Sequence, residues 1–179
     1  MKTGLALLAL GALAPMLQSA LAPYISAALC PDLGLLLVVA VGLSGRSVAG
    51  GLLFSGFVGF VADLLSGALL GQHALLRVLA FAAARSANVH VNLVGIGAKG
   101  IFVAILTVLN GLAMGGITAF FSPGTGFAAI GIRELALGAL VNALVAPLVT
   151  LVVSFALTRL DDEGEGRRLM RLEPRRWSA

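Results

Sequence analysis

Residues 100–132, GIFVAILTVLNGLAMGGITAFFSPGTGFAAIGI, form a run of 33 residues without a charged side chain. An α-helix needs about 20 consecutive apolar residues to cross the roughly 30 Å hydrocarbon core of a bilayer. Two more uncharged runs reach that length, 29 residues at 3–31 and 24 residues at 135–158. These three runs predict a chain that crosses a membrane several times as helices.

The composition of the whole chain agrees with this prediction. Of its 179 residues, 59% are hydrophobic and 11% are charged, whereas soluble domains have about 45–50% apolar and about 25% charged residues. A soluble protein needs a polar shell, which so few charges cannot provide. A transmembrane barrel would show stretches of about ten residues that alternate in polarity, and no stretch here alternates in that way. We therefore predict an all-α integral membrane protein.

The basic residues gather in the last part of the chain. Six of the twelve lie between residues 159 and 176, directly after the last apolar run. Membrane topology and anionic lipid headgroups explain a polybasic segment in this place, so the net charge of +4 does not predict nucleic-acid binding. The mixture of arginines with Leu and Trp177 suits either a helix lying on the membrane surface or a disordered tail.

Proline, glycine and charged residues divide the chain into about six expected helices, which would form a compact transmembrane bundle. The expected helices cover residues 3–21, 33–43, 47–66, 72–87, 98–120 and 133–158. Residues 88–97 either extend the fourth helix or lie in the membrane interface. The second helix is short for a crossing, so a re-entrant pair with the third helix, or a total of five or four crossings, is the alternative. Pro15 predicts a kink in the first helix, which we expect to be retained rather than cleaved as a signal peptide.

The distribution of Lys and Arg predicts the orientation in the membrane. With six crossings, ten of the twelve basic residues lie on one side, and loops rich in Lys and Arg face the cytoplasm. We therefore expect both termini in the cytoplasm. The transmembrane domain would cover residues 1–159, and a charged cytoplasmic tail would cover residues 160–179.

Two pairs of polar residues in the apolar segments are candidates for contacts between helices. Asp63 and Arg77 are equidistant from residue 70 in a predicted turn, so they would lie at similar depth in neighbouring antiparallel helices. A charge inside a membrane needs a partner, and this pair would either fix the register of the two helices or belong to an ion relay. Asn110 and Asn142 are placed in the same way around residue 126, so they would either hydrogen-bond to each other or each face another subunit.

Small residues form a stripe on the third expected helix. Gly51, Ser55 and Gly59 follow one another at a spacing of four, which places them on one helix face. Such a stripe lets another helix approach closely. The approaching helix would belong either to this bundle or to a partner protein, and Gly111 and Gly115 allow the same two interpretations on the fifth helix.

The sequence contains no recognisable catalytic set. His73 and His90 are far apart and have no Cys, Glu or His at metal-ligand spacing. No glycine-rich loop is followed by the Lys-Ser or Lys-Thr that nucleotide binding requires. We therefore expect a non-enzymatic protein without a metal or cofactor.

The central part of the chain, residues 30–80, resembles the rod shape-determining protein MreD family of bacteria. The resemblance depends on Pro31-Asp32-Leu33 at the start of a Leu/Val-rich helix, followed by Arg46 and the glycine-rich third helix. It continues through Asp63-Leu64-Leu65-Ser66-Gly67 and the segment Leu70-Gly71-Gln72-His73-Ala74-Leu75. Arg77 departs from the family pattern, which has an uncharged residue there, and the charged tail is longer than the pattern requires.

The resemblance implies a non-enzymatic, multi-pass subunit of the cell-elongation complex in the bacterial inner (plasma) membrane. Such a subunit would bind the single-span protein MreC and help couple MreB filaments to the peptidoglycan synthases. The candidate interface for the MreC helix consists of Pro31, Asp32, Gly51, Ser55 and Gly59. The alternative is a substrate-binding membrane subunit of an energy-coupling-factor vitamin transporter, which would need a polar, aromatic-lined pocket.

Overall fold

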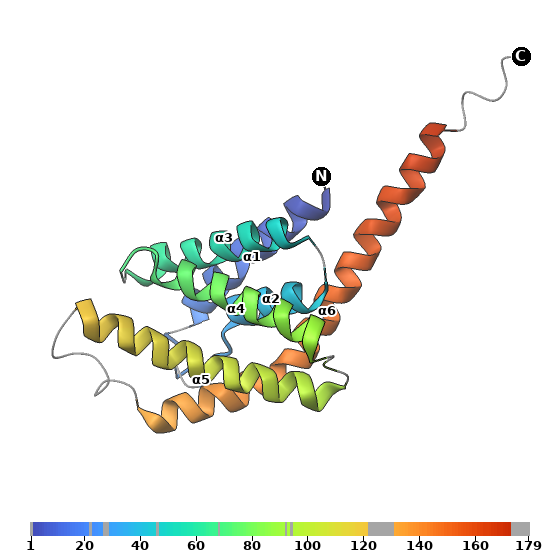
Figure 1. Cartoon of the computed structure of the whole chain (residues 1–179). Helices are drawn as coiled ribbons and strands as arrows, with labels where there is room; N and C mark the ends of the chain where they lie inside the picture. Colours follow the sequence, from blue (N-terminus) through green and yellow to red (C-terminus); the bar gives the residue numbers. More distant parts are fainter. Residues whose placement is uncertain are drawn as a thin grey trace, which may run out of the picture.

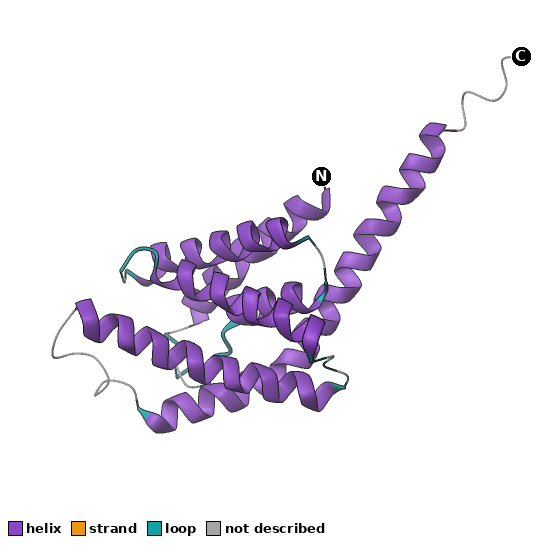
Figure 2. Ribbon diagram, in the orientation of Figure 1, coloured by secondary structure: helices purple, strands orange, loops and turns teal. Residues whose placement is uncertain are grey.

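The computed structural model describes residues 2–21, 23–26, 29–45, 47–67, 69–91, 93, 95–121 and 131–172, with the side chains of 2, 3 and 159–172 left undescribed. The described residues form six helices joined by turns and contain no strand (Figures 1 and 2). The helices are α1 (Lys2–Leu21), α2 (Leu33–Leu43), α3 (Val48–Ser66), α4 (Gln72–His90), α5 (Ile96–Phe121) and α6 (Ile132–Leu172). The prediction of an all-α chain is confirmed.

The helix boundaries differ from the predicted ones mainly at two places. α4 continues to His90, so part of the ambiguous segment 88–97 extends this helix. α6 is 41 residues long and continues through the predicted domain boundary at residues 159–160. From Arg159 onward the sequence becomes polar, so we expect this part of α6 to lie outside the hydrocarbon. A helix does not have to end at that point, because polar residues also form helices.

Four of the described helices are long and apolar enough to span a membrane. These segments are Gly4–Leu21 of α1, α3, α5, and Ile132–Thr158 of α6. α2 has only 11 residues, and the polar side chains of α4 lower its hydropathy. By length and composition, the chain is a helical membrane protein with four candidate spans.

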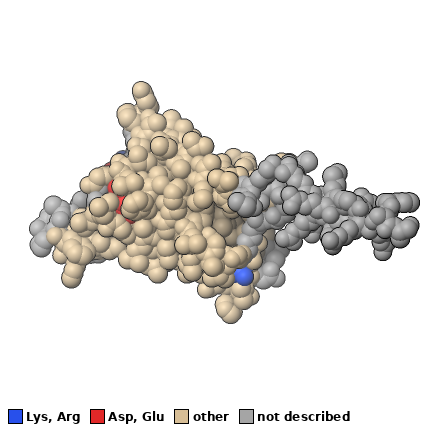
Figure 3. All heavy atoms as spheres, turned by 90° about the horizontal axis from the view of Figure 1, so that it is seen from above, with Lys and Arg blue, Asp and Glu red and all other residues tan. Residues whose placement is uncertain are grey.

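The surface and the interior have the polarity expected of a protein in lipid. Large apolar side chains such as Leu5, Leu53 and Leu144 are mostly exposed, whereas Asp63 and Arg77 are buried. Figure 3 shows a face with few charged atoms, and the acidic ones gather toward one end. An uncharged exterior is stable against hydrocarbon, where an unpaired charge is costly.

The shortest helix lies at the centre of the bundle. α2 packs against all five other described helices, and eight of its 11 residues are buried. Leu35 and Val38 are completely inaccessible to solvent. A helix that is hydrophobic on all sides is expected in an interior position, because no face of it needs contact with water.

The small-residue stripe of α3 faces α4, another helix of the same chain. A Cβ atom at Gly51 would overlap the ring of Phe81, and one at Gly59 would overlap the backbone of Ala74. Ser55 is completely buried and donates its hydroxyl to the Leu52 carbonyl at 2.9 Å. The stripe therefore serves internal packing, and its prediction as a binding surface for a partner helix is wrong because α4 covers it.

Two helices contain proline inside the apolar bilayer-length segments. α1 remains one helix around Pro15. α6 contains Pro147 and changes direction between its first and second halves (Figure 1), as expected where proline removes a backbone hydrogen bond. The N-terminal end of α1 and the C-terminal part of α6 point to the same side of the bundle in Figure 1.

Substitution of Gly59 by Ala is expected to destabilise the protein, because the added methyl group would overlap the backbone of α4. Overpacking of this kind costs about 1–3 kcal/mol. The matched control is Gly56→Ala on the same helix, where a Cβ would meet only Val78, at 3.8 Å. Thermal unfolding of the purified protein in detergent should show a lower midpoint for Gly59→Ala alone; equal midpoints would contradict the packing of α3 on α4.

Candidate functional site

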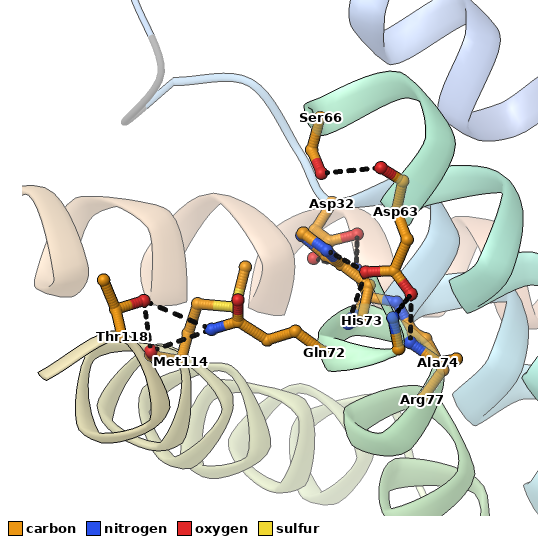
Figure 4. A network of polar contacts seen from close by, with 10 residues as sticks. Asp32, Asp63, Ser66, Gln72, His73, Ala74, Arg77, Met114 and Thr118 are labelled. Atoms are coloured by element: carbon orange, nitrogen blue, oxygen red, sulfur yellow. Dashed lines mark hydrogen bonds and ion pairs between the residues drawn. The ribbon is translucent and has the colours of Figure 1, made fainter. Parts of the chain in front are cut away.

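Three segments that are distant in sequence meet at one end of the bundle. They are the residues before α2, the last turn of α3, and the first two turns of α4. Figure 4 shows Asp32, Asp63, His73 and Arg77 side by side in this region. We call these four residues the polar cluster.

Asp32 connects the start of α2 to α4. Its carboxylate accepts a hydrogen bond from the backbone N–H of Leu35 at 2.9 Å and so caps α2. The same carboxylate accepts from Nη2 of Arg77 at 2.8 and 2.7 Å. The Arg77 side chain is 5% exposed and that of Asp32 is 23% exposed, so the pair lies at the edge of the buried interior.

The predicted ion pair between Asp63 and Arg77 is therefore wrong in its partner. The prediction considered only the two helices joined by the turn at residues 67–71. The structure adds α2, whose first turn brings the carboxylate of Asp32 to Arg77. Once this pair has formed, Asp63 is available to a different set of donors.

Asp63 organises the turn between α3 and α4. Its carboxylate accepts hydrogen bonds from the backbone N–H groups of Gly71, His73 and Ala74 at 2.9, 2.8 and 3.2 Å. Nδ1 of His73 lies 2.9 Å from the same carboxylate. The first N–H groups of a helix have no partner within it, and Gly71, the N-cap of α4, has no side chain to supply one. Asp63 supplies this cap from the preceding helix.

The predicted hydrogen bond between Asn110 and Asn142 is also wrong in its partner. Asn142 of α6 accepts from the backbone N–H of Asp32 at 2.8 Å and donates to Thr107 of α5 at 3.2 Å. Thr107 is three residues before Asn110, so α5 presents a different residue of the same region to α6. Oδ1 of Asn110 is buried and has no hydrogen-bond partner among the described atoms.

Gln72 is a connecting residue that the sequence analysis did not identify. Its amide Nε2 donates to the Met114 carbonyl at 3.0 Å and to the Thr118 hydroxyl at 3.2 Å, both on α5 (Figure 4). The sequence contained a signal for this role, because Gln72 is a polar residue at the start of a helix in a mostly apolar chain. Such a residue needs a hydrogen-bond partner on another helix. Together with Asp32, Asp63 and Asn142, it links α2, α3, α4, α5 and α6 by polar contacts.

A cavity of about 330 Å³ lies beside the polar cluster. It is bordered by α1, α2, α3 and α4, and its polar lining residues are Gln18, Ser19, Asp32, Ser66, His73 and Arg77. Nε and Nη1 of Arg77 are buried without a hydrogen-bond partner among the described atoms. The polar residues of its lining make the cavity suitable for a small polar group, such as water, an amide or a hydroxyl.

The described residues form no group of three or more His, Cys, Asp or Glu side chains that could hold a metal ion. Comparison with known proteins gives no match to a protein-family model, to a curated protein or to a solved structure. Of the residues that carry the family resemblance, Arg46 lies outside the described part of the chain. The segments 31–33, 63–67 and 70–75 contribute Asp32, Asp63 and His73 to the polar cluster, and Arg77 lies outside them.

The Asp32–Arg77 pair can be tested by a double-mutant cycle. Asp32→Asn and Arg77→Gln are each expected to destabilise strongly, by about 3–5 kcal/mol, because each leaves the other charge buried and unpaired. The double variant should recover part of this loss, with a coupling energy above about 1 kcal/mol. Unfolding titrations in sodium dodecyl sulfate measure the four free energies.

The control cycle combines Asp63→Asn with Arg77→Gln. Here the coupling energy should be smaller than for Asp32, because Asp63 and Arg77 have separate hydrogen-bond partners. A larger coupling for Asp63 than for Asp32 would favour the pair predicted from the sequence and would contradict the structure.

Proposed function

We propose that this chain is a non-enzymatic, multi-pass subunit of the cell-elongation complex in a bacterial inner membrane, of the MreD type. The observation that supports the proposal most is the convergence of the family-like segments. Segments 31–33, 63–67 and 70–75 come from different helices, and the hydrogen bonds of Asp32 and Asp63 bring them to one place. Residues that meet in this way depend on one another for their hydrogen bonds, so we expect them to occur together in related proteins.

The chemistry of the polar cluster favours a structural role over catalysis. The carboxylates of Asp32 and Asp63 already accept hydrogen bonds from helix N-termini, from Arg77 and from His73. A general acid or base must be free to exchange a proton with a substrate. These carboxylates instead hold helices together, which suits a subunit that works by presenting membrane surfaces to partners.

The proposed topology has six crossings and both termini in the cytoplasm. Two observations support it: the ends of α1 and α6 point to the same side (Figure 1), and six crossings place ten of the twelve basic residues on one side. α2 and α4 would cross within the shelter of the other helices. Their shortness and polarity are acceptable there, because α2 is buried on most sides and Arg77 of α4 is paired.

The surface that we propose for the MreC helix is an apolar groove between α1 and α6. Its volume is about 650 Å³, and its lining includes Leu13, Leu17 and Ala20 of α1 and Val152 and Ala156 of α6. Leu13, Leu17 and Val152 are more than half exposed, so a partner can reach them from the lipid. A single membrane helix packs well against such a mixture of small and branched side chains. This groove replaces the stripe at Gly51, Ser55 and Gly59, which α4 covers.

Depletion of the protein from rod-shaped bacteria that depend on it tests the general proposal. We expect the cells to lose their rod shape and become round while the synthesis of other membrane proteins continues. Expression of the unchanged chain should restore the rods. A normal shape after complete depletion would contradict the proposal.

A bulky substitution in the groove tests the partner surface. Ala20→Trp should reduce co-purification of MreC at least tenfold, because the indole fills the space that the helix would occupy. The matched control is Leu53→Trp on the exposed side of α3, which is 77% exposed and outside the groove. Equal recovery of MreC with both variants, at equal amounts in the membrane, would contradict docking in this groove.

The cavity beside the polar cluster supports a second candidate, the substrate-binding subunit of a vitamin transporter. Its six polar lining residues suit a small polar ligand. Its lining contains one aromatic side chain, the imidazole of His73, whereas such transporters need aromatic surfaces for their ring-shaped substrates. Loss of vitamin uptake without a change of shape on depletion would favour this candidate.

A further inference from the structure

A second cavity lies at the other end of α2. Its volume is about 600 Å³, within the roughly 300–1,000 Å³ of ligand pockets. It is formed by the end of α2, the end of α4, Leu93, the first turn of α5 and residues 144–154 of α6. None of its lining residues belongs to the polar cluster.

The lining of this cavity has an apolar part and a polar part. The apolar part consists of Ala40, Leu43, Leu93, Ile96, Leu144, Pro147, Leu148 and Leu151. The polar part consists of Ser44, Asn88, Lys99, Thr150 and Ser154. A ligand that fits both parts must be amphiphilic.

The charge of the cavity is positive. Lys99 is the charged residue in its lining, and no described carboxylate forms an ion pair with it. The described acidic side chains belong to the opposite end of the bundle: Asp32 precedes α2, Asp63 is near the end of α3, and Glu134 is in the first turn of α6. Arg85 adds positive charge nearby, because its Nη1 lies 3.3 Å from the Cβ position of Gly45, next to the lining residue Ser44.

The cavity is accessible from the lipid side of α6. Leu144 and Leu151 line it and are 72% and 65% exposed. A molecule already in the bilayer can therefore place its chains against α6 and its headgroup against Lys99. Basic pockets between membrane helices are known to bind anionic lipid headgroups on the cytoplasmic side.

We propose that this cavity binds an anionic phospholipid. The ammonium of Lys99 pairs with the phosphate, and the amide of Asn88 can donate to headgroup oxygens. The hydroxyls of Ser44 and Thr150 donate to the carbonyls of Val41 and Ala146, so they can accept from the hydroxyl groups of a headgroup. The leucines of α6 cover the first part of the acyl chains. The site has Leu148 in common with the lining of the MreC groove, and it does not depend on the proposed function.

The test compares lipids added to the purified full chain in detergent. Phosphatidylglycerol should raise the midpoint of thermal unfolding by several degrees, because a ligand that binds only the folded state stabilises it. Phosphatidylcholine should raise it far less, and native mass spectrometry should detect one retained phosphatidylglycerol. Equal effects of the two lipids would overturn the proposal.

Substitutions separate this site from the arginines of the tail, which also attract anionic lipid. Lys99→Gln should lose most of the stabilisation by phosphatidylglycerol, and Lys99→Arg should keep it. The matched control Arg133→Gln removes a positive charge from the opposite end of α6 and should respond like the unchanged protein. An undiminished response of Lys99→Gln would overturn the proposal.

Two further measurements test the need for acyl chains. Leu144→Trp should block the cavity and abolish the response, whereas Leu140→Trp, one turn earlier and outside the lining, should retain it. This pair also serves if Lys99→Gln fails to fold. Glycerol phosphate, which has the charge but no chains, should have no effect; stabilisation by it equal to that by phosphatidylglycerol would overturn the assignment to a lipid.

Discussion

The guanidinium of Arg77 is a charge buried in the interior of a membrane bundle, and the arrangement of several helices depends on neutralising it. An isolated charge at this depth costs at least a few kcal/mol. Asp32 provides the partner, and it does so from the first turn of α2, so the pair holds α2 against α4. The backbone N–H of Asp32 also donates to Asn142, which attaches α6 to the same point. The ion pair and this backbone hydrogen bond thus join three helices at Asp32.

The remaining polar contacts follow a common rule, in which a side chain of one helix satisfies the free backbone or side-chain groups of another. Asp63 accepts from the first N–H groups of α4, and Gln72 donates to a carbonyl of α5. Such contacts remove polar groups from hydrocarbon while they join neighbouring helices. Close packing of α3 on α4 at Gly51 and Gly59 makes the short distances between them possible. The polar side chains of α4 are therefore held toward the other helices, and apolar side chains such as Leu75 and Leu79 face outward.

The two ends of the bundle differ in chemistry, and the proposals follow this difference. One end contains the described carboxylates and a cavity beside Arg77, and the segments on which the proposed MreD-type function depends meet there. The other end contains Lys99 and Arg85 around a cavity of mixed polarity that suits an anionic lipid. The apolar groove of α1 and α6 offers a partner helix a separate surface. Under the proposed function, these surfaces would hold partners together in a membrane.

The sequence by itself determined the helices, because the length of an apolar run and the places of proline, glycine and charge act locally along the chain. It also indicated that Asp63, Arg77 and Asn142 need partners, because a polar group in hydrocarbon is costly wherever it lies. Only the tertiary structure decided which partners they have. The predicted pairs are based on equal distance from one turn, which compares only the two helices that the turn joins. In the structure, α2 and α5 come from distant parts of the chain and bring Asp32 and Thr107 into contact with Arg77 and Asn142. For the same reason the stripe at Gly51, Ser55 and Gly59 indicated a close helix contact, and only the fold showed that the helix is α4.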